Sequence, residues 1–576
     1  MLYPRIREHA HGRDIVQTFG GYNHNLRIAE GEFYDMTNMT SSDYPVLSPR
    51  KPRGIYKKDV NALGIISKEE FCYADGENFV IGDTTYPMGL TAEEKTLISM
   101  GAYVIIMPDK KYINTAKPED RGDIEATMVT SGEVTFSLCT LDGVEYNNIT
   151  VSATEPSRVN MAYWLDTSSK PNVLKQYSSA SGMWVSVSST YVKIAYPGIG
   201  NTFAKGDGIS ISDIESELLS DLNSSMVVQA SSEDYIVVVG IIQETVKQDT
   251  PITIARRMPE MDFIIESDNR LWGCRYGKSI DGEHVNEIYA SKLGDFKNWN
   301  SFSGISTDSY VVSVGSDGPF TGAITHLGYP LFFKENTLHK IYGSMPSNYQ
   351  VQTTTVRGVQ KGCAKSLSIV NEILYYKARS AVCAYDGSLP VEMSSALGEV
   401  AYESACAGTL GNKYYISMRS KEDGKYHLFV YDTKKGLWHR EDNEKALAFA
   451  EHGGVLYYID EHNNIKTTVG DNVLAEDRVK WSAETGLLGV NDPDKKYISR
   501  IDIRMSMSVS SYVDLYIEYD SSGEWEKVFS MYGDRLRSFS IPIKAKRSDH
   551  IRIKIEGLGN AKIFSICKTI EGGSGQ

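Results

Sequence analysis

The side chains in this sequence that could do chemistry are mainly carboxylates, since Asp and Glu together number 74 among 576 residues. Hydrolysis of a glycosidic bond needs two carboxylates at a fixed separation in space, which spacing along the chain does not reveal. Motifs that can be read locally are missing: there is no GxxxxGK[ST] phosphate loop, no HExxH zinc motif and no GxSxG nucleophile turn. We therefore expect a protein that is not an enzyme, with no catalytic residue, no metal ion and no cofactor.

Tryptophans are the second group, because an exposed indole ring can stack on a sugar. The turns SSASGMW, DTKKGLW and DSSGEW end in Trp184, Trp438 and Trp525. They are similar to the Asp-box turn of sialidases but lack its full pattern, and the simpler interpretation is a hairpin closed by a tryptophan. The alternative function is a receptor- or glycan-binding protein, with Trp164, Trp184 and Trp525 as stacking residues. A propeller glycoside hydrolase is less favoured.

The composition favours an all-β fold as the scaffold for these side chains. Hydrophobic residues make up 41% of the chain, enough for real cores, and there are 36 tyrosines and 49 glycines. Tyrosine suits pleated, half-buried surfaces, and glycine suits the turns between strands. Two short segments, Thr91–Ser99 and Ser212–Ser225, have the best helical patterns.

A repeat in the second half of the chain predicts a β-propeller. Phe332, Tyr375, Tyr414 and Tyr457 each follow a Gly or Asn turn and lie about 40 residues apart, a spacing typical of propeller blades. We predict about six or seven blades, with the first blades in 56–121 and the remaining blades in 257–476. The alternative is a series of β-sandwiches with coincidental spacing.

Two regions fall outside the repeat. Residues 122–256 are rich in strand patterns without the aromatic anchor, and we interpret them as a β domain inserted in a propeller loop. Residues 477–576 alternate strictly, as in Ile551, Ile553 and Ile555, which predicts half-buried antiparallel strands and a C-terminal β-sandwich.

Charge and cysteine content limit the classes of partner. The net charge of −14 argues against a protein that wraps nucleic acid, which needs Lys and Arg to neutralise phosphates. The seven cysteines are scattered and form no CxxC pair, so we expect buried core residues rather than disulfides or a zinc site. No apolar run is long enough to cross a bilayer, and the N-terminus lacks the apolar stretch of a secretory signal. We expect no membrane partner and synthesis in a cytoplasm.

The sequence resembles bacteriophage tail nozzle and related virion structural proteins at three places. These are FGGYNHNLRIAEGEFYDMTNMTSSDYPVLSPRKPRG from Phe19, the stretch from DNRLWGCRYG to GDFKNW in 268–299, and the C-terminal DHIRIKIEGLGNAKIFSICKTIEGGS. The resemblance implies a hexameric ring at the end or junction of a tail, located in the virion and assembled in the host cytoplasm. For the alternative function, receptor or glycan binding, it implies a place at the tail tip. It implies contacts with other tail or head–tail connector proteins, and genomic DNA passing through the lumen without specific binding. A lumen of like charge keeps DNA from sticking.

The first 55 residues are expected to form an extended N-terminal lead-in, polar and rich in turns. Such a segment gains order by lying across its own propeller or that of a neighbouring copy. We predict that copies associate through this segment and through the insertion, with Arg27 and Arg50 as charge-pairing residues. The predicted anchors are Phe19, Tyr22, Phe33, Tyr34, Met36, Met39, Tyr44 and Leu47.

Overall fold

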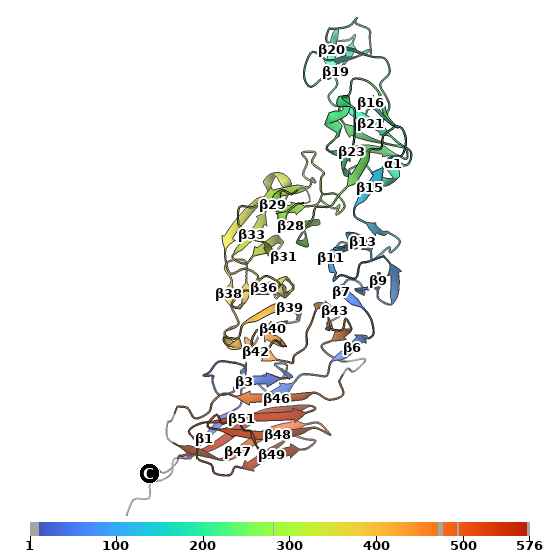
Figure 1. Cartoon of the computed structure of the whole chain (residues 1–576). Coiled ribbons are helices and arrows are strands. Elements are labelled where there is room, and N and C mark those ends of the chain that lie inside the picture. The colour runs from blue at the N-terminus through green and yellow to red at the C-terminus, as the bar shows by residue number, and fades with distance from the viewer. Residues whose placement is uncertain (1–10, 280–281, 471–475, 492–494, 573–576) are drawn as a thin grey trace, which may run out of the picture.

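The computed structural model describes residues 11–279, 282–470, 476–491 and 495–572. Its regular secondary structure is almost entirely β-strand, and the molecule is elongated, with three parts in a row (Figure 1). A propeller occupies the middle, the insertion extends from one end, and a β-sandwich lies at the other. The all-β class and the order of the three parts agree with the sequence-based prediction.

Seven four-stranded antiparallel sheets form the propeller within the described residues. Blades 1 to 3 contain β7 (Ala62–Ser67), β8 (Phe71–Asp75), β9 (Asn78–Ile81) and β10 (Thr84–Pro87); β11 (Thr96–Met100), β12 (Tyr103–Met107), β13 (Lys111–Asn114) and β14 (Arg121–Asp123); and β27 (Phe263–Ser267), β28 (Arg270–Lys278), β29 (His284–Ala290) and β30 (Tyr310–Ser313). Blades 4 to 6 contain β31 (Phe320–His326), β32 (Tyr329–Lys334), β33 (Thr337–Tyr342) and β34 (Gln350–Thr355); β35 (Ser368–Val370), β36 (Ile373–Lys377), β37 (Val382–Tyr385) and β38 (Val391–Glu392); and β39 (Tyr402–Leu410), β40 (Lys413–Ser420), β41 (Tyr426–Asp432) and β42 (Leu437–Arg440).

The ring is closed by a strand from the N-terminal part of the chain. Blade 7 consists of β43 (Ala448–His452), β44 (Val455–Ile459), β45 (Ile465–Thr467) and β6 (Gly54–Lys57), and β6 pairs with β45. The first strands of successive blades lie against one another around the ring, and β43 of the last blade contacts β7 of the first. Between β31 and blade 5 the contact is made by the short 3₁₀ segment Ala364–Ser366. Each blade keeps its own first strand as a sheet edge, and closure of the ring protects these short edges.

Repeated turns explain the spacing seen in the sequence. Asp268–Asn269 join the first two strands of blade 3, and Asn371–Glu372 join those of blade 5. All four residues have positive φ, as a two-residue type I′ hairpin requires. The aromatic anchors Phe332 and Tyr375 follow such turns on the second strand of a blade and are buried. Tyr414 is buried as well and follows the turn Gly411–Asn412, in which Gly411 has positive φ, whereas Tyr457 follows Gly453–Gly454 and is half-buried.

The insertion leaves and re-enters the propeller at one place, between β14 and β27. Its first strand, β15 (Ala126–Val129), pairs with its last, β26 (Thr253–Arg256). The eight-stranded sheet also contains β16 (Val134–Cys139), β21 (Tyr191–Ala195), β22 (Gly208–Ser212), β23 (Ser225–Ser232), β24 (Tyr235–Val239) and β25 (Val246–Gln248). A distal sheet is formed by β17 (Ile149–Ser152), β18 (Tyr163–Asp166), β19 (Val173–Ser178) and β20 (Met183–Ser186).

The β-sandwich has two sheets that combine the two ends of the described chain. One sheet is ordered β1 (His11–Val16), β52 (Ala561–Gly572), β47 (Lys496–Met507) and β50 (Arg537–Pro542). The other is ordered β2 (Gly21–Tyr22), β3 (Glu32–Thr37), β46 (Lys480–Thr485), β51 (Ile551–Leu558), β48 (Tyr512–Tyr519) and β49 (Glu526–Tyr532). The predicted alternating faces, including Ile501, Ile503 and Ile555, are buried between the sheets.

Three local predictions need correction. The lead-in is not an irregular extended segment, because β1 and β3 are full members of the sandwich sheets (Figure 1). Residues 91–99 contain no helix: Thr96–Met100 form β11, whose pairing with β12 outweighs local helix propensity. Within 212–225 the only helical element is the 3₁₀ segment Glu217–Leu222.

Two other expectations concern the whole chain. All seven cysteines are buried and unpaired, as expected for core residues. In the described residues, no helix has the length and apolar character needed to cross a membrane.

Candidate functional site at the N-terminal segment

The N-terminal segment, defined here as residues 11–57, lies between the propeller and the sandwich of its own chain. Val16 pairs with Ile566 in β52, and Met36 pairs with Ala483 in β46. The backbone N–H of His24 donates to the carbonyl of Ala396 in the propeller, at 2.8 Å. The segment therefore joins three parts of the chain. It contributes β6 to blade 7, contacts blades 5 and 6, and adds strands to both sheets of the sandwich.

Most of the predicted anchors are buried inside this single chain. Seven of the ten predicted interface residues are at most 6% exposed: Phe19, Tyr22, Phe33, Met36, Met39, Leu47 and Arg50. Phe33 stacks on Phe19 and Tyr22 packs against Phe429 of blade 6. These residues hold the segment on its own chain, so they are not open to a neighbouring copy. Tyr34 is half-buried, whereas Tyr44 and Arg27 are exposed.

Arg50 and a second arginine, Arg53, form a buried charge network with blade 6. Nη1 of Arg50 lies 2.6 Å from Glu476, and its Nη2 lies 3.1 Å from Asp442. Nη2 of Arg53 lies 2.8 Å from Glu441, and its side chain is only 3% exposed. Burial alone raises the pKa of Glu476, but the hydrogen bonds and charge of Arg50 outweigh it and hold that pKa below its ordinary value.

The role of Arg50 as a charge-pairing residue was expected from the sequence, whereas Arg53 was missed. Its only local signal is the repeated basic pattern of SPRKPRG. The carboxylates that it meets lie nearly 390 residues away along the chain.

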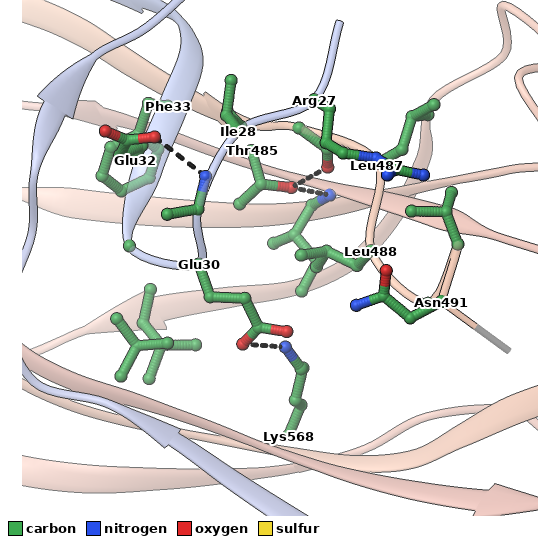
Figure 2. Close-up of a pocket in the computed structure, with 18 of the residues that line it drawn as sticks. Arg27, Ile28, Glu30, Glu32, Phe33, Thr485, Leu487, Leu488, Asn491 and Lys568 are labelled. Carbon is green, nitrogen blue, oxygen red and sulfur yellow. Dashed lines mark hydrogen bonds and ion pairs between the residues drawn. The ribbon is translucent and has the colours of Figure 1, made fainter.

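A cavity of about 460 Å³ opens between the N-terminal segment and the sandwich (Figure 2). The loop containing Arg27 and Ile28 forms one wall and Leu487 and Leu488 form another, while most of the remaining lining is apolar. One end is charged, because Nζ of the buried Lys568 lies 2.5 Å from Glu30 and 2.9 Å from Asp14. A cavity of this size and character can hold a small, mainly apolar ligand.

The three tryptophans proposed as stacking residues are not brought together. Trp164 and Trp184 lie in the distal sheet of the insertion, 5.5 Å apart by ring centroids, whereas Trp525 lies in the sandwich at the other end of the molecule (Figure 1). Trp164 is 6% exposed, its N–H donates to the Ser152 carbonyl, and Lys175 covers its ring. Lys554 lies over the Trp525 ring, 4.7 Å from its centroid. Trp184 is the partly exposed ring of the distal pair.

The propeller axis holds a separate cavity of about 330 Å³. It is lined by residues of blades 1, 2, 5, 6 and 7, including Lys95 and Lys365. Glu451 is the single carboxylate among the described lining residues, and Lys365 is paired with Glu94. The lining therefore does not supply the two facing carboxylates that glycoside hydrolysis requires.

Comparisons with known proteins give distant structural matches only. No protein-family model and no curated protein matches the sequence. Among solved structures, the chain is similar to an exo-β-1,3-galactanase from Phanerochaete chrysosporium (8% identity, 53% of this chain and 94% of that chain, TM-score 0.21). It is also similar to apo AztD from Citrobacter koseri (8% identity, 88% and 98%, TM-score 0.25) and to a Trypanosoma rangeli sialidase (8% identity, 91% and 96%, TM-score 0.17).

These comparisons correct the prediction that the protein is not an enzyme. Glycoside hydrolases and a sialidase are among the structures that the chain matches, so the exclusion of enzymatic activity is withdrawn. All of these TM-scores are below 0.5, and the similarity therefore carries no argument for a particular reaction or substrate.

Proposed function

We propose that this protein is a structural component of a bacteriophage tail, a nozzle or tail-junction ring that forms part of the DNA ejection conduit. The observation that carries the proposal is that the two chain ends bearing the resemblance form one structural unit. Leu47 of the N-terminal segment exchanges backbone hydrogen bonds with Ile563 near the C-terminus, at 3.1 and 2.9 Å. The two similar stretches of sequence therefore belong to the same folded unit, the sandwich.

A rigid connection between the parts supports this role. The wall of a conduit must keep its shape while DNA passes through it. In this chain the N-terminal segment is clamped on both sides, by the buried Arg50 and Arg53 network toward blade 6 and by the β3–β46 ladder toward the sandwich. Separating the two parts would also expose apolar side chains that the segment buries, such as Tyr22 against Phe429, and that exposure is costly.

Surface chemistry supports assembly with copies of the same chain. Blade 3 exposes Phe302 and Ile305, at 54% and 55%, and the sandwich exposes Tyr532 at 61%. Large exposed apolar and aromatic side chains are favoured at contacts between subunits. The partners in this proposal are other copies in a ring, for which the resemblance implies six, and neighbouring tail or connector proteins. The net charge of −14 suits a wall past which DNA moves without binding.

The proposal is tested by measuring the mass of particles formed by the full-length protein, alone and with isolated tail-less capsids. We expect a ring, or assembly that depends on capsids, and we expect the double variant Phe302→Asp, Ile305→Asp to reduce it. Lys58→Gln, an exposed change elsewhere, is the matched control. A stable monomer that does not bind capsids would rule out the conduit role.

A further inference from the structure

A second cleft, of about 840 Å³, lies where the N-terminal segment, blade 6 and the sandwich meet. Thr40 and Ser42 contribute from the N-terminal segment, Lys413 and Lys434 from blade 6, and Ser511 from the sandwich. We call it the basic cleft. It is distinct from the apolar cavity of Figure 2, which opens between the N-terminal segment and the sandwich alone.

The basic cleft has a charge opposite to that of the whole chain. Among the described residues, its lining holds seven Lys and Arg side chains against four Asp and Glu side chains, whereas the chain as a whole carries −14. A concave site with an excess of one charge concentrates its field on a ligand of the other sign. The lining is otherwise rich in hydroxyl and amide groups, including Asn412 and Asn560.

Three of the cleft lysines have no ion pair among the described residues. Nζ of the half-buried Lys413 is held by Thr40 Oγ1 at 3.1 Å and Ser42 Oγ at 3.0 Å, with no described carboxylate within 4 Å. Burial lowers the pKa of Lys413. Lys51 and Lys434 are exposed and likewise unpaired in the described part of the chain. An anion could therefore bind these ammonium groups without displacing a carboxylate.

A buried hydroxyl in the same lining also lacks a partner. Thr468 is 6% exposed, and its Oγ1 makes no hydrogen bond within the described structure. A buried polar atom without a partner is costly, and a bound ligand can satisfy it. Nearby, burial and the positive charges of Lys413 and Lys435 hold the pKa of His439 well below its ordinary value, which agrees with a positive local potential.

We propose that the basic cleft binds a phosphate ester of a small polyhydroxylated molecule, such as a polyol phosphate or a sugar phosphate. Ammonium groups that lack carboxylate partners can form ion pairs with a phosphate dianion, and lysine binds phosphate as a point charge. The surrounding hydroxyl and amide groups can form hydrogen bonds with the hydroxyl groups of the ligand. The volume is in the range of small-molecule sites, about 300–1,000 Å³, which favours a compact ligand over a polymer. This inference does not depend on the proposed role in a tail.

Isothermal titration of the full-length protein with glycerol 3-phosphate tests the inference. We expect saturable binding of one molecule per chain and no binding of glycerol. Lys434→Gln, which removes an exposed and unpaired ammonium group, should weaken binding about tenfold because one charge-assisted contact is lost. Lys58→Gln, an exposed lysine on the other side of β6, should leave it unchanged.

Each other outcome overturns a stated part of the inference. Lack of saturable binding, or equal loss of affinity in both lysine variants, would show that the basic cleft is not the binding site. Equal affinity for inorganic phosphate would show that the cleft does not recognise the hydroxylated part of the ligand. Equal affinity for glycerate would show that it does not prefer a phosphate group. Displacement of glycerol 3-phosphate by a short single-stranded oligonucleotide would assign the cleft to nucleic acid instead.

Discussion

At the scale of single residues, charge pairs buried beneath the N-terminal segment are the most consequential feature. Arg53 contacts Glu441, Asp442 and the Tyr458 hydroxyl while remaining 3% exposed at its side chain. Its guanidinium offers several donors in a fixed fork, so it can serve several acceptors at once. Another side chain at position 53 could not contact all of these acceptors at once.

Arg53→Met should lower the free energy of unfolding by about 3–5 kcal/mol, because the buried carboxylates lose one of their two arginine partners. Chemical denaturation measures the change. The matched control is Arg357→Met, which removes an exposed ion pair with Glu392 and should cost about 0–1 kcal/mol. Equal costs for the two variants would show that burial of the Arg53 network does not matter.

The pairing of Arg50 with Glu476 predicts a pH dependence. Because the pKa of Glu476 in the folded protein lies below its ordinary value of 4.5, the carboxylate stabilises the fold at neutral pH. That contribution is lost as the pH falls below 4.5 and through the lowered pKa. The stability gap between the wild type and Arg50→Met should therefore be largest at neutral pH and shrink in acid. Denaturation at several pH values measures it, and a gap independent of pH would contradict the pairing.

At the scale of elements, the contact between β2 and β42 determines how the N-terminal segment meets blade 6. Gly21 has a φ of +86°, and a Cβ added there would overlap the carbonyl oxygen of Trp438. Its neighbour Gly20 has no positive φ, and an added Cβ there would lie 2.9 Å from a side-chain carbon of Glu32, so a side chain and not the backbone would have to move. Gly21 is therefore the more restricted of the two glycines.

Gly21→Ala should destabilise the protein by about 1–3 kcal/mol, because it combines an unfavourable φ with a backbone clash. Gly20→Ala is the matched control and should cost less. Thermal unfolding followed by circular dichroism compares the two variants. If Gly20→Ala proves to be the more damaging change, the β2–β42 contact is not as described.

At the scale of the whole molecule, the insertion is attached to the propeller at a single neck. Ala126 and Arg256 are partners in an antiparallel ladder, so the two ends of the insertion are adjacent. The insertion has a hydrophobic core of its own, which includes Phe136, Ile194 and Ile236. The propeller ring is formed entirely by strands outside it.

Joining Glu125 to Arg257 through a short glycine linker should therefore leave the propeller and sandwich folded. We expect a modest loss of stability, because Asn298 loses its hydrogen bonds with Asp207 and Gly208. Residues 126–256 expressed alone should fold. Near-ultraviolet circular dichroism of both products is the measurement, and an unfolded propeller would show that the insertion is part of its core.

Neighbouring residues alone specify most of the local structure of this protein. Alternation such as Ile551, Ile553 and Ile555 predicted strands, and the repeated turns before Tyr375 and Tyr414 predicted blades, because side-chain direction and turn conformation depend on neighbouring residues. The three-part division followed from the same local patterns. Even here β11 was missed, since its strand is stabilised by pairing with β12 and not by its own composition.

The way in which distant segments combine follows from long-range contacts and could not be predicted from local patterns. Closure of the ring by β6, the addition of β1 and β3 to the C-terminal sandwich, and the Arg50–Glu476 pair all join residues about 400 or more positions apart. The basic cleft likewise takes its lysines from separate parts of the chain. Burial and hydrogen bonding select such partners among many compatible strands and charges. Local sequence patterns therefore do not show which distant segments will pair.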